Sequence, residues 1–218
     1  MSLHVAIADD HSAIRVGLKF IVQEWMPDSV VFFAEDIPKL LRLVAEEVIH
    51  IVVLDINMPG GNNFHVVKMI KEIQKNVKVL VLSTYGEELY ALRYIDAGAD
   101  GYLQKDCEEE KIIDALDTVY QGKKYLSDGL RDQLLQNRMN QGPGSNGNPL
   151  HLLTDRELEV CHQLVNGKGV SEIAKTLFIH TSTVGTYKNK IYKKFNVQNL
   201  KQLIDTFSIH NDATKSLS

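Results

Sequence analysis

Five short apolar runs in the first half of this 218-residue chain limit most strongly how it can fold. Several of them are apolar throughout, which is typical of strands buried on both faces of a sheet. Helical patterns separate them, and the clearest places Ile14, Leu18 and Val22, together with Ile21, on one face. Because parallel neighbours need crossover connections, this alternation predicts an α/β fold with a doubly wound, five-stranded parallel sheet. The expected strands cover residues 3–8, 29–34, 50–56, 77–83 and 101–104.

A run rich in Gly, Asn and Pro divides the chain in two. Residues 142–149 read GPGSNGNP, a composition that sustains neither helix nor strand, and a weak helical pattern over 128–139 precedes it. We therefore expect a flexible tether at this point. The expected parts are a first domain over 1–126, a partly helical linker over 127–149, a second domain over 150–210 and a flexible tail over 211–218.

The second domain is predicted to be small and entirely helical. Thr154 and Glu157 have the spacing of a capping box at the start of its first helix, which ends near Gly167. A short helix then leads through a tight turn at 178–180 into a longer, lysine-rich helix over about 182–195. Short helix, tight turn and longer basic helix are typical of a helix-turn-helix, which a fourth helix follows from about residue 200.

The net charge of −4 hides opposite charges in the two halves. Residues 1–148 hold 15 Lys and Arg against 22 Asp and Glu, whereas residues 149–218 hold 9 against 6. An acidic half suits phosphoryl chemistry organised by a metal, and a basic half suits a polyanion such as nucleic acid. The sequence lacks a long apolar segment or a signal peptide, and Cys107 and Cys161 have no metal-site spacing, so we expect a cytoplasmic protein without membrane contact.

Polar side chains follow four of the expected strands. Asp9 and Asp10 end the first strand and Asp55 the third, at the carboxyl edge where such sheets collect functional groups. Carboxylates crowded together repel one another, and a hard cation such as Mg²⁺ relieves that repulsion. Ser83 and Lys105 end the fourth and fifth strands, where a hydroxyl and an ammonium would accommodate a phosphoryl group on a carboxylate.

Each of these residues also has a simpler explanation on its own. Asp9 or Asp10 could cap the first helix, Ser83 could be a loop serine and Lys105 a solvated lysine. Their joint placement makes coincidence a poor explanation, and the glycine-rich motifs of dinucleotide and P-loop sites are absent. A phosphatase of the haloacid dehalogenase type would need an acid two positions after its nucleophile, where this sequence has Asn57.

Four segments, IADD at 7–10, LDINMPG at 54–60, VLST at 81–84 and GADGYLQKD at 98–106, resemble the receiver domain of two-component response regulators, a flavodoxin-like fold. The resemblance implies that Asp55 accepts a phosphoryl group from a sensor histidine kinase. It also implies that Lys105 and Ser83 contact this group and that Tyr102 is a switch residue that changes rotamer. The implied Mg²⁺ ligands are Asp10, Asp55, the backbone carbonyl of Asn57 and, through water, Asp9.

The lysine-rich helix of the second domain is expected to have two faces. Val184, Ile191 and Phe195 form an apolar stripe that should pack on the other helices. The opposite face carries residue types that bind base edges and phosphates, although such a face, taken alone, is more simply explained as solvated. Its residues are Thr186, Asn189, Lys190 and Lys193.

Three segments of the second half, LTDRELEV at 153–160, SEIAKTLFI at 171–179 and STVGTYKNKIYKKFNV at 182–197, resemble the LuxR-type helix-turn-helix of NarL/FixJ regulators. This resemblance implies binding to promoter DNA and a homodimer on activation. Gly185 and Tyr187 depart from the basic residue and His that the family usually has. The DNA contacts assigned on this basis are Thr183, Thr186, Asn189, Lys190 and Lys193 and, secondarily, Tyr187 and Lys188. The last-helix residues Leu203, Ile204 and Phe207 fit dimerisation and core packing equally well.

These observations together predict a phosphorylation-controlled transcription regulator and not an enzyme. We hypothesise that phosphorylation shifts a pre-existing equilibrium from a closed form, with the DNA-binding helix masked, to an open form that dimerises on paired half-sites. RNA polymerase is a further candidate partner. Two alternatives remain: an adaptor whose C-terminal domain binds protein instead of DNA, and an aspartyl-phosphate phosphatase.

Overall fold

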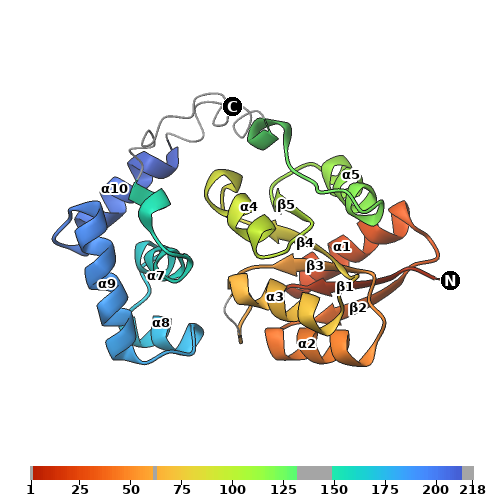
Figure 1. Ribbon diagram of the computed structural model, residues 1–218, viewed down its shortest axis with the longest axis horizontal. Coiled ribbons are helices and arrows are strands. Elements are labelled where there is room, and N and C mark those ends of the chain that lie inside the picture. The colour runs from red at the N-terminus through yellow and green to blue at the C-terminus, as the bar shows by residue number, and fades with distance from the viewer. Residues whose placement is uncertain (1, 61–62, 132–148, 213–218) are drawn as a thin grey trace. The chain divides into compact units, whose positions relative to one another are not determined.

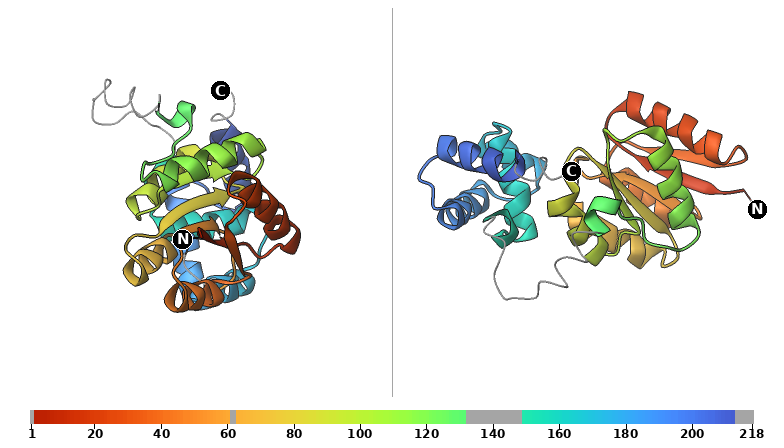
Figure 2. Two further views of the ribbon diagram at one scale, coloured as in Figure 1. Left: turned by 90° about the vertical axis from the view of Figure 1, so that its right-hand side faces the viewer. Right: turned by 90° about the horizontal axis from the view of Figure 1, so that it is seen from above.

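The computed structural model describes residues 2–60, 63–131 and 149–212, which divide into two compact units, Met1–Arg131 and Asp132–Ser218 (Figures 1 and 2). The linker helix expected over 128–139 is helical over 128–131, and its remaining residues lie outside the described part. Residues 213–218 of the expected tail also lie outside it. Among the described residues, no helix has both the length and the apolar character needed to cross a bilayer.

The N-terminal unit is built on the predicted parallel sheet. All neighbouring strands are parallel, in the order β2-β1-β3-β4-β5, so the strand order reverses beside β1. This order confirms the expected doubly wound, five-stranded fold. The strands are β1 (His4–Ala8), β2 (Val30–Ala34), β3 (Ile51–Asp55), β4 (Lys78–Ser83) and β5 (Gly101–Gln104).

Helices cover both faces of this sheet (Figure 1). On one face, α1 (Ser12–Trp25) and α5 (Glu109–Tyr120) pack over a core that includes Leu18, Val22 and Leu116. The apolar face predicted for the first helix is therefore confirmed. The other face carries α2 (Ile37–Glu46), α3 (Asn63–Ile73) and α4 (Glu87–Asp96).

Strand register determines which side chains meet at the carboxyl edge of the sheet. Ala8 of β1 pairs with Leu54 of β3, so the next residues, Asp9 and Asp55, lie side by side where the two strands end. This edge coincides with the reversal of strand order, the position at which doubly wound sheets bind their ligands.

The C-terminal unit is entirely helical among its described residues, as predicted. Thr154 and Glu157 form the expected capping box, in which each side chain accepts a hydrogen bond from the other residue's backbone N–H. Residues 177–180 link the second and third α-helices of the unit, as in a helix-turn-helix, and include the turn expected at 178–180. The final helix extends to Asp212, two residues beyond the predicted domain end. The elements are η1 (Pro149–Leu152), α7 (Asp155–Val165), α8 (Val170–Thr176), α9 (Thr181–Phe195) and α10 (Leu200–Asp212).

The last helix is held to its own unit by buried side chains. Leu203 is fully buried, and the Phe207 ring meets the buried His162 of α7 edge-on, with ring centroids 4.8 Å apart. Leu203 and Phe207 therefore belong to the core of this unit, whereas Ile204 is only partly buried.

Candidate functional site

Two buried carboxylates and a lysine meet at the carboxyl edge of the sheet. Asp9 and Asp55 are 1% and 3% exposed. The Lys105 ammonium lies between them, with Nζ 2.6 Å from Asp9 Oδ2 and 2.9 Å from Asp55 Oδ2. Its position follows from the sheet, because the Lys105 N–H extends the β4–β5 pairing by donating to the Ser83 carbonyl at 2.8 Å. The lysine partly offsets the repulsion between the two carboxylates.

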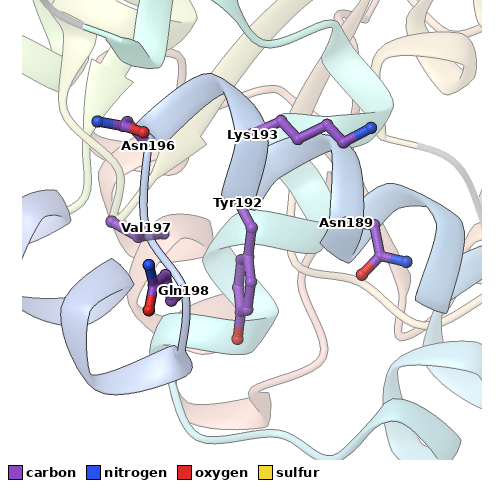
Figure 3. Close-up of a pocket in the computed structure, with 6 residues that line it drawn as sticks. All are labelled: Asn189, Tyr192, Lys193, Asn196, Val197 and Gln198. Carbon is purple, nitrogen blue, oxygen red and sulfur yellow. The ribbon is translucent and has the colours of Figure 1, made fainter.

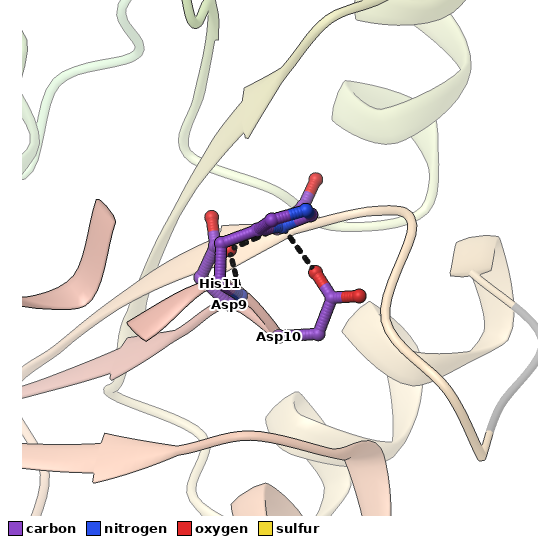
Figure 4. A group of neighbouring side chains, drawn as sticks. Asp9, Asp10 and His11 are labelled. Atoms are coloured by element: carbon purple, nitrogen blue, oxygen red, sulfur yellow. Dashed lines mark hydrogen bonds and ion pairs between the residues drawn. The ribbon is translucent and has the colours of Figure 1, made fainter. Parts of the chain in front are cut away.

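Two further side chains enlarge this group into a candidate cation site. Asp9, Asp10, His11 and Asp55 each offer one ligand atom, and these atoms all lie within 4.8 Å of one another. Figure 4 shows His11 Nδ1 between Asp10 Oδ1, at 2.7 Å, and Asp9 Oδ1, at 3.3 Å. Three carboxylates are the hard oxygen ligands that Mg²⁺ prefers, so this donor set fits a divalent cation.

The helix-cap explanation of the two leading aspartates does not account for this group. His11, not an aspartate, is the N-cap residue of α1, and its side chain makes no capping hydrogen bond. Asp9 Oδ1 accepts a hydrogen bond from the His11 N–H at 2.8 Å, which orients its carboxylate beside Lys105. Asp10 is half-exposed, so its carboxylate remains available to a ligand.

Burial and charge act in opposite directions on the ionisable groups of the site. Burial raises the pKa of Asp55, and the attraction of Lys105 offsets this only in part. Burial lowers the pKa of Lys105, but its hydrogen bond to Asp9 and the attraction of Asp55 outweigh burial and raise it overall. Lys105 therefore remains a cation at neutral pH, next to a carboxylate that is costly to ionise.

Ser83, Tyr102 and Asn57, the remaining residues of the predicted site, belong to the same region as Asp55 and Lys105. Ser83 and Tyr102 are fully buried, and Ser83 Oγ accepts a hydrogen bond from the Tyr85 N–H at 3.0 Å. The Tyr102 hydroxyl donates to the Tyr85 carbonyl at 2.9 Å, and burial raises its pKa, so it stays protonated. The Asn57 N–H donates to Asp55 Oδ1 at 3.3 Å. The sequence did not point to Tyr85 or to His11, whose only signal is its place directly after two aspartates.

In the C-terminal unit, α9 has the two predicted faces. The stripe of Val184, Ile191 and Phe195 is buried, as expected. Residues on the opposite side extend into solvent, and three other assigned residues are only partly exposed. The exposed residues are Thr186, Asn189, Lys190 and Lys193, and the partly exposed ones are Thr183, Tyr187 and Lys188.

The lysines of α9 have different environments. Lys194 Nζ donates to Glu157 Oε2 at 2.6 Å and to the Leu152 carbonyl at 2.8 Å, which fastens α9 to the start of α7. Lys190 lies 5.9 Å from the centre of the Tyr187 ring, a cation–π contact on the helix surface. Lys194 is thus part of the fold, whereas Lys190 and Lys193 are free to reach a polyanion.

A pocket of about 540 Å³ opens at the C-terminal end of α9 (Figure 3). Amide and ammonium groups dominate its lining, and such donors can bind phosphate oxygens. Asn196, at the end of the helix, has a left-handed backbone with φ of 53°, which asparagine tolerates well. The lining residues are Asn189, Tyr192, Lys193, Asn196, Val197 and Gln198.

Two protein families match the two units. Residues 5–117 match the family described as "Response regulator receiver domain", and residues 151–207 match "Bacterial regulatory proteins, luxR family". The receiver match contains the Asp9, Asp55 and Lys105 group, and the second match contains α9.

Several known proteins are similar to the chain over nearly its whole length. Oxygen regulatory protein NreC of Staphylococcus epidermidis is 31% identical over 93% of this chain and 95% of its own length. Fimbriae Z protein of Escherichia coli is 29% identical over 92% of this chain and 94% of its own length. The structure of RcsB from Salmonella enterica serovar Typhimurium bound to promoter P1flhDC in the presence of phosphomimetic BeF₃⁻ has 25% identity and a TM-score of 0.70, covering 95% of this chain and 99% of that one.

Proposed function

This chain belongs to the response regulators that carry a LuxR-type DNA-binding domain, and from this premise we propose that phosphorylation of Asp55 controls its binding to promoter DNA. The observation that carries the proposal is the Lys105 ammonium, which lies within 2.9 Å of Asp55 at the strand-order reversal. The family consists of transcription regulators and not of enzymes, so the phosphatase alternative is not favoured.

Phosphoryl transfer to Asp55 would proceed by direct displacement. A carboxylate oxygen of Asp55 attacks phosphorus, a new P–O bond forms, and the P–N bond to the imidazole of a kinase phosphohistidine breaks. Lys105 would then bind the phosphoryl oxygens, and the Ser83 hydroxyl proton would point to one of them. Mg²⁺, held by Asp10, Asp55 and the Asn57 carbonyl, with Asp9 assisting through water, would supply positive charge for the transferring group.

The second part of the proposal concerns α9 as the helix that enters the major groove. The fold turns its exposed residues away from the packed stripe, as a recognition helix requires. Thr186 and Asn189 would meet base edges, Lys190 and Lys193 would neutralise phosphates, and Thr183 would contact the backbone. Tyr187 and Lys188, partly exposed, would contribute at the margin. Asn196 and Gln198 extend this surface beyond the helix.

The wider setting follows from this function. A sensor histidine kinase would be the phosphoryl donor, in the cytoplasm, and RNA polymerase would be a partner at the promoter. The similar RcsB structure holds that protein on a promoter in the presence of a phosphomimetic. By analogy, the phosphorylated form of this chain would bind paired half-sites as a homodimer.

Incubation with acetyl phosphate and Mg²⁺, followed by intact-mass measurement, tests the phosphoacceptor. The wild-type protein should gain the mass of one phosphoryl group, and Asp55→Asn should gain none. Asp114→Asn is the matched control, because Asp114 is exposed on α5 and should leave the mass gain unchanged. A mass gain that persists in Asp55→Asn would place the acceptor elsewhere.

A further inference from the structure

Five aromatic rings form a chain of contacts from Tyr102, the expected switch residue, through helices α3 and α4. The centroid of the Tyr102 ring in β5 lies 5.9 Å from that of Tyr94 in α4. Tyr94 in turn stacks on Phe64 of α3, with ring centroids 4.4 Å apart. The rings of Phe64 and Tyr90 are parallel, with centroids 6.1 Å apart, and Tyr90 stacks on Tyr85 with centroids 5.0 Å apart. We call these five residues the aromatic circuit, and four of them are at most 5% exposed.

The two ends of the aromatic circuit meet at the backbone beside Ser83. The Tyr102 hydroxyl donates to the Tyr85 carbonyl, while the Tyr85 N–H donates to Ser83 Oγ. The Tyr102 hydroxyl also hydrogen-bonds the Ser83 side chain. The buried rotamer of Tyr102 is therefore linked to Ser83 directly and through the backbone of Tyr85.

We propose that Tyr94 is a positioning residue that holds Tyr102 in its buried rotamer, and that Phe64, stacked on the Tyr94 ring, keeps that ring in place. The inference rests on the proposed role of Asp55 and names the side chain that regulates its site. A Tyr102 ring that turned outward would leave the Tyr94 ring without its neighbour, and close-packed interiors resist such voids. The rotamer equilibrium of Tyr102 thus depends on a ring in another element.

The size of the effect follows from the strength of aromatic pairs. Loss of one such pair should lower the ratio of buried to exposed Tyr102 by about two- to tenfold. A phosphoryl analogue that binds better to the buried form should lose affinity by up to the same factor, because a ligand shifts an equilibrium only through its preference for one state.

The test uses full-length protein in which 3-fluorotyrosine replaces tyrosine, observed by ¹⁹F NMR. The Tyr102 signal is the one that disappears in Tyr102→Phe. In Tyr94→Leu we expect a second Tyr102 signal at a solvent-exposed shift in the resting protein. We also expect BeF₃⁻ with saturating Mg²⁺ to bind about two- to tenfold more weakly by calorimetry. Tyr94→Phe keeps the ring and should restore both properties.

Tyr120→Leu is the matched control. The Tyr120 ring lies outside the aromatic circuit and meets Trp25, with ring centroids 5.7 Å apart, so its loss should change neither property. Phe64→Leu, if Tyr94→Leu fails to fold, should reproduce the exposed signal by removing the support of Tyr94. An unchanged Tyr102 signal in folded Tyr94→Leu, or equal effects of Tyr94→Phe and Tyr94→Leu, would overturn the proposal. If wild-type protein fails to bind BeF₃⁻, the proposed phosphoacceptor function fails, while the resting ¹⁹F signal still decides the role of Tyr94.

Discussion

Asp55 combines deep burial with a charge that its proposed chemistry requires. Nucleophilic attack on phosphorus needs the ionised carboxylate, yet burial raises its pKa above the ordinary value for Asp. The folded protein therefore binds this proton more tightly than the unfolded chain does. The associated stability is fully present below the ordinary pKa of Asp and is lost as the pH rises through the raised value.

The first consequence is a pH-dependent gain in stability for Asp55→Asn. At pH 7.5 the free energy of unfolding of this variant should be higher than that of wild type, because the amide carries no charge that burial penalises. The difference should shrink as the pH falls through the raised pKa of Asp55, because wild-type Asp55 then takes up its proton. Urea unfolding followed by the fluorescence of Trp25, the only tryptophan of the chain, measures the N-terminal unit directly.

Asp10→Asn is the control for this experiment. Its carboxylate is half-exposed and well solvated, so the substitution should change the free energy of unfolding by less than about 0.5 kcal/mol. Marked destabilisation by Asp55→Asn at neutral pH would contradict the account, because it would mean that the carboxylate contributes more through Lys105 than it costs in burial.

Among the helices, α9 carries a glycine in its interior. Apart from its chain neighbours and the backbone of its own helix, Gly185 has no atom within 4 Å of the position that a Cβ would occupy, so a methyl group would meet open space. Gly185→Ala should stabilise the C-terminal unit by about 0.5–1 kcal/mol, because glycine loses more backbone entropy in a helix than alanine does. Thermal unfolding by circular dichroism, with hydrogen exchange over residues 181–195, checks this expectation.

A substitution in a strand should have the opposite sign. A Cβ added at Gly101 of β5 would lie 2.8 Å from Leu80 Cδ1 and 3.0 Å from Tyr125 Cβ, both in the packed interior. Gly101→Ala should therefore destabilise the N-terminal unit. Equal effects of the two substitutions would mean that backbone entropy and not local space decides the outcome.

The elements themselves were largely predictable, because continuous apolar runs and period-3.6 patterns record burial directly. The strands of the sheet follow from the apolar runs, and the capping box at Thr154 and the buried stripe of α9 follow from local spacing. Contacts between elements leave no such record. Two examples are the hydrogen bond from Lys194 of α9 to Glu157 of α7 and the stack of Phe64 of α3 on Tyr94 of α4. Both depend on how helices pack together, and residue spacing within one helix does not reveal this.

The two halves of the chain carry opposite charges, which suit two different tasks. The acidic N-terminal half suits a cation and a phosphoryl group, whereas the basic C-terminal half suits a polyanion. A protein-binding adaptor could share this architecture, so the response of DNA binding to salt is the property that separates the two functions. Each phosphate neutralised by a lysine releases counterions, and this makes affinity fall steeply as salt rises.

Two lysines of α9 should account for part of this salt dependence. Wild-type protein should bind duplex DNA with an affinity that falls linearly with salt on a double-logarithmic plot. The double variant Lys190→Ala, Lys193→Ala should reduce the steepness of this line by about 2, close to one for each phosphate that a lysine no longer neutralises. Fluorescence anisotropy of a labelled duplex at four or more salt concentrations gives the slope without knowledge of the target sequence.

Lys201→Ala provides the control within the same unit, because Lys201 is exposed on α10 and lies outside the predicted contacts. It removes a charge of the same kind, so a general loss of attraction to DNA would lower both slopes. Only the α9 variant should change the slope if this helix enters the groove. A flat salt dependence in the wild-type protein, at any phosphorylation level, would instead favour the adaptor, because a polyanion cannot be bound by lysines without releasing its counterions.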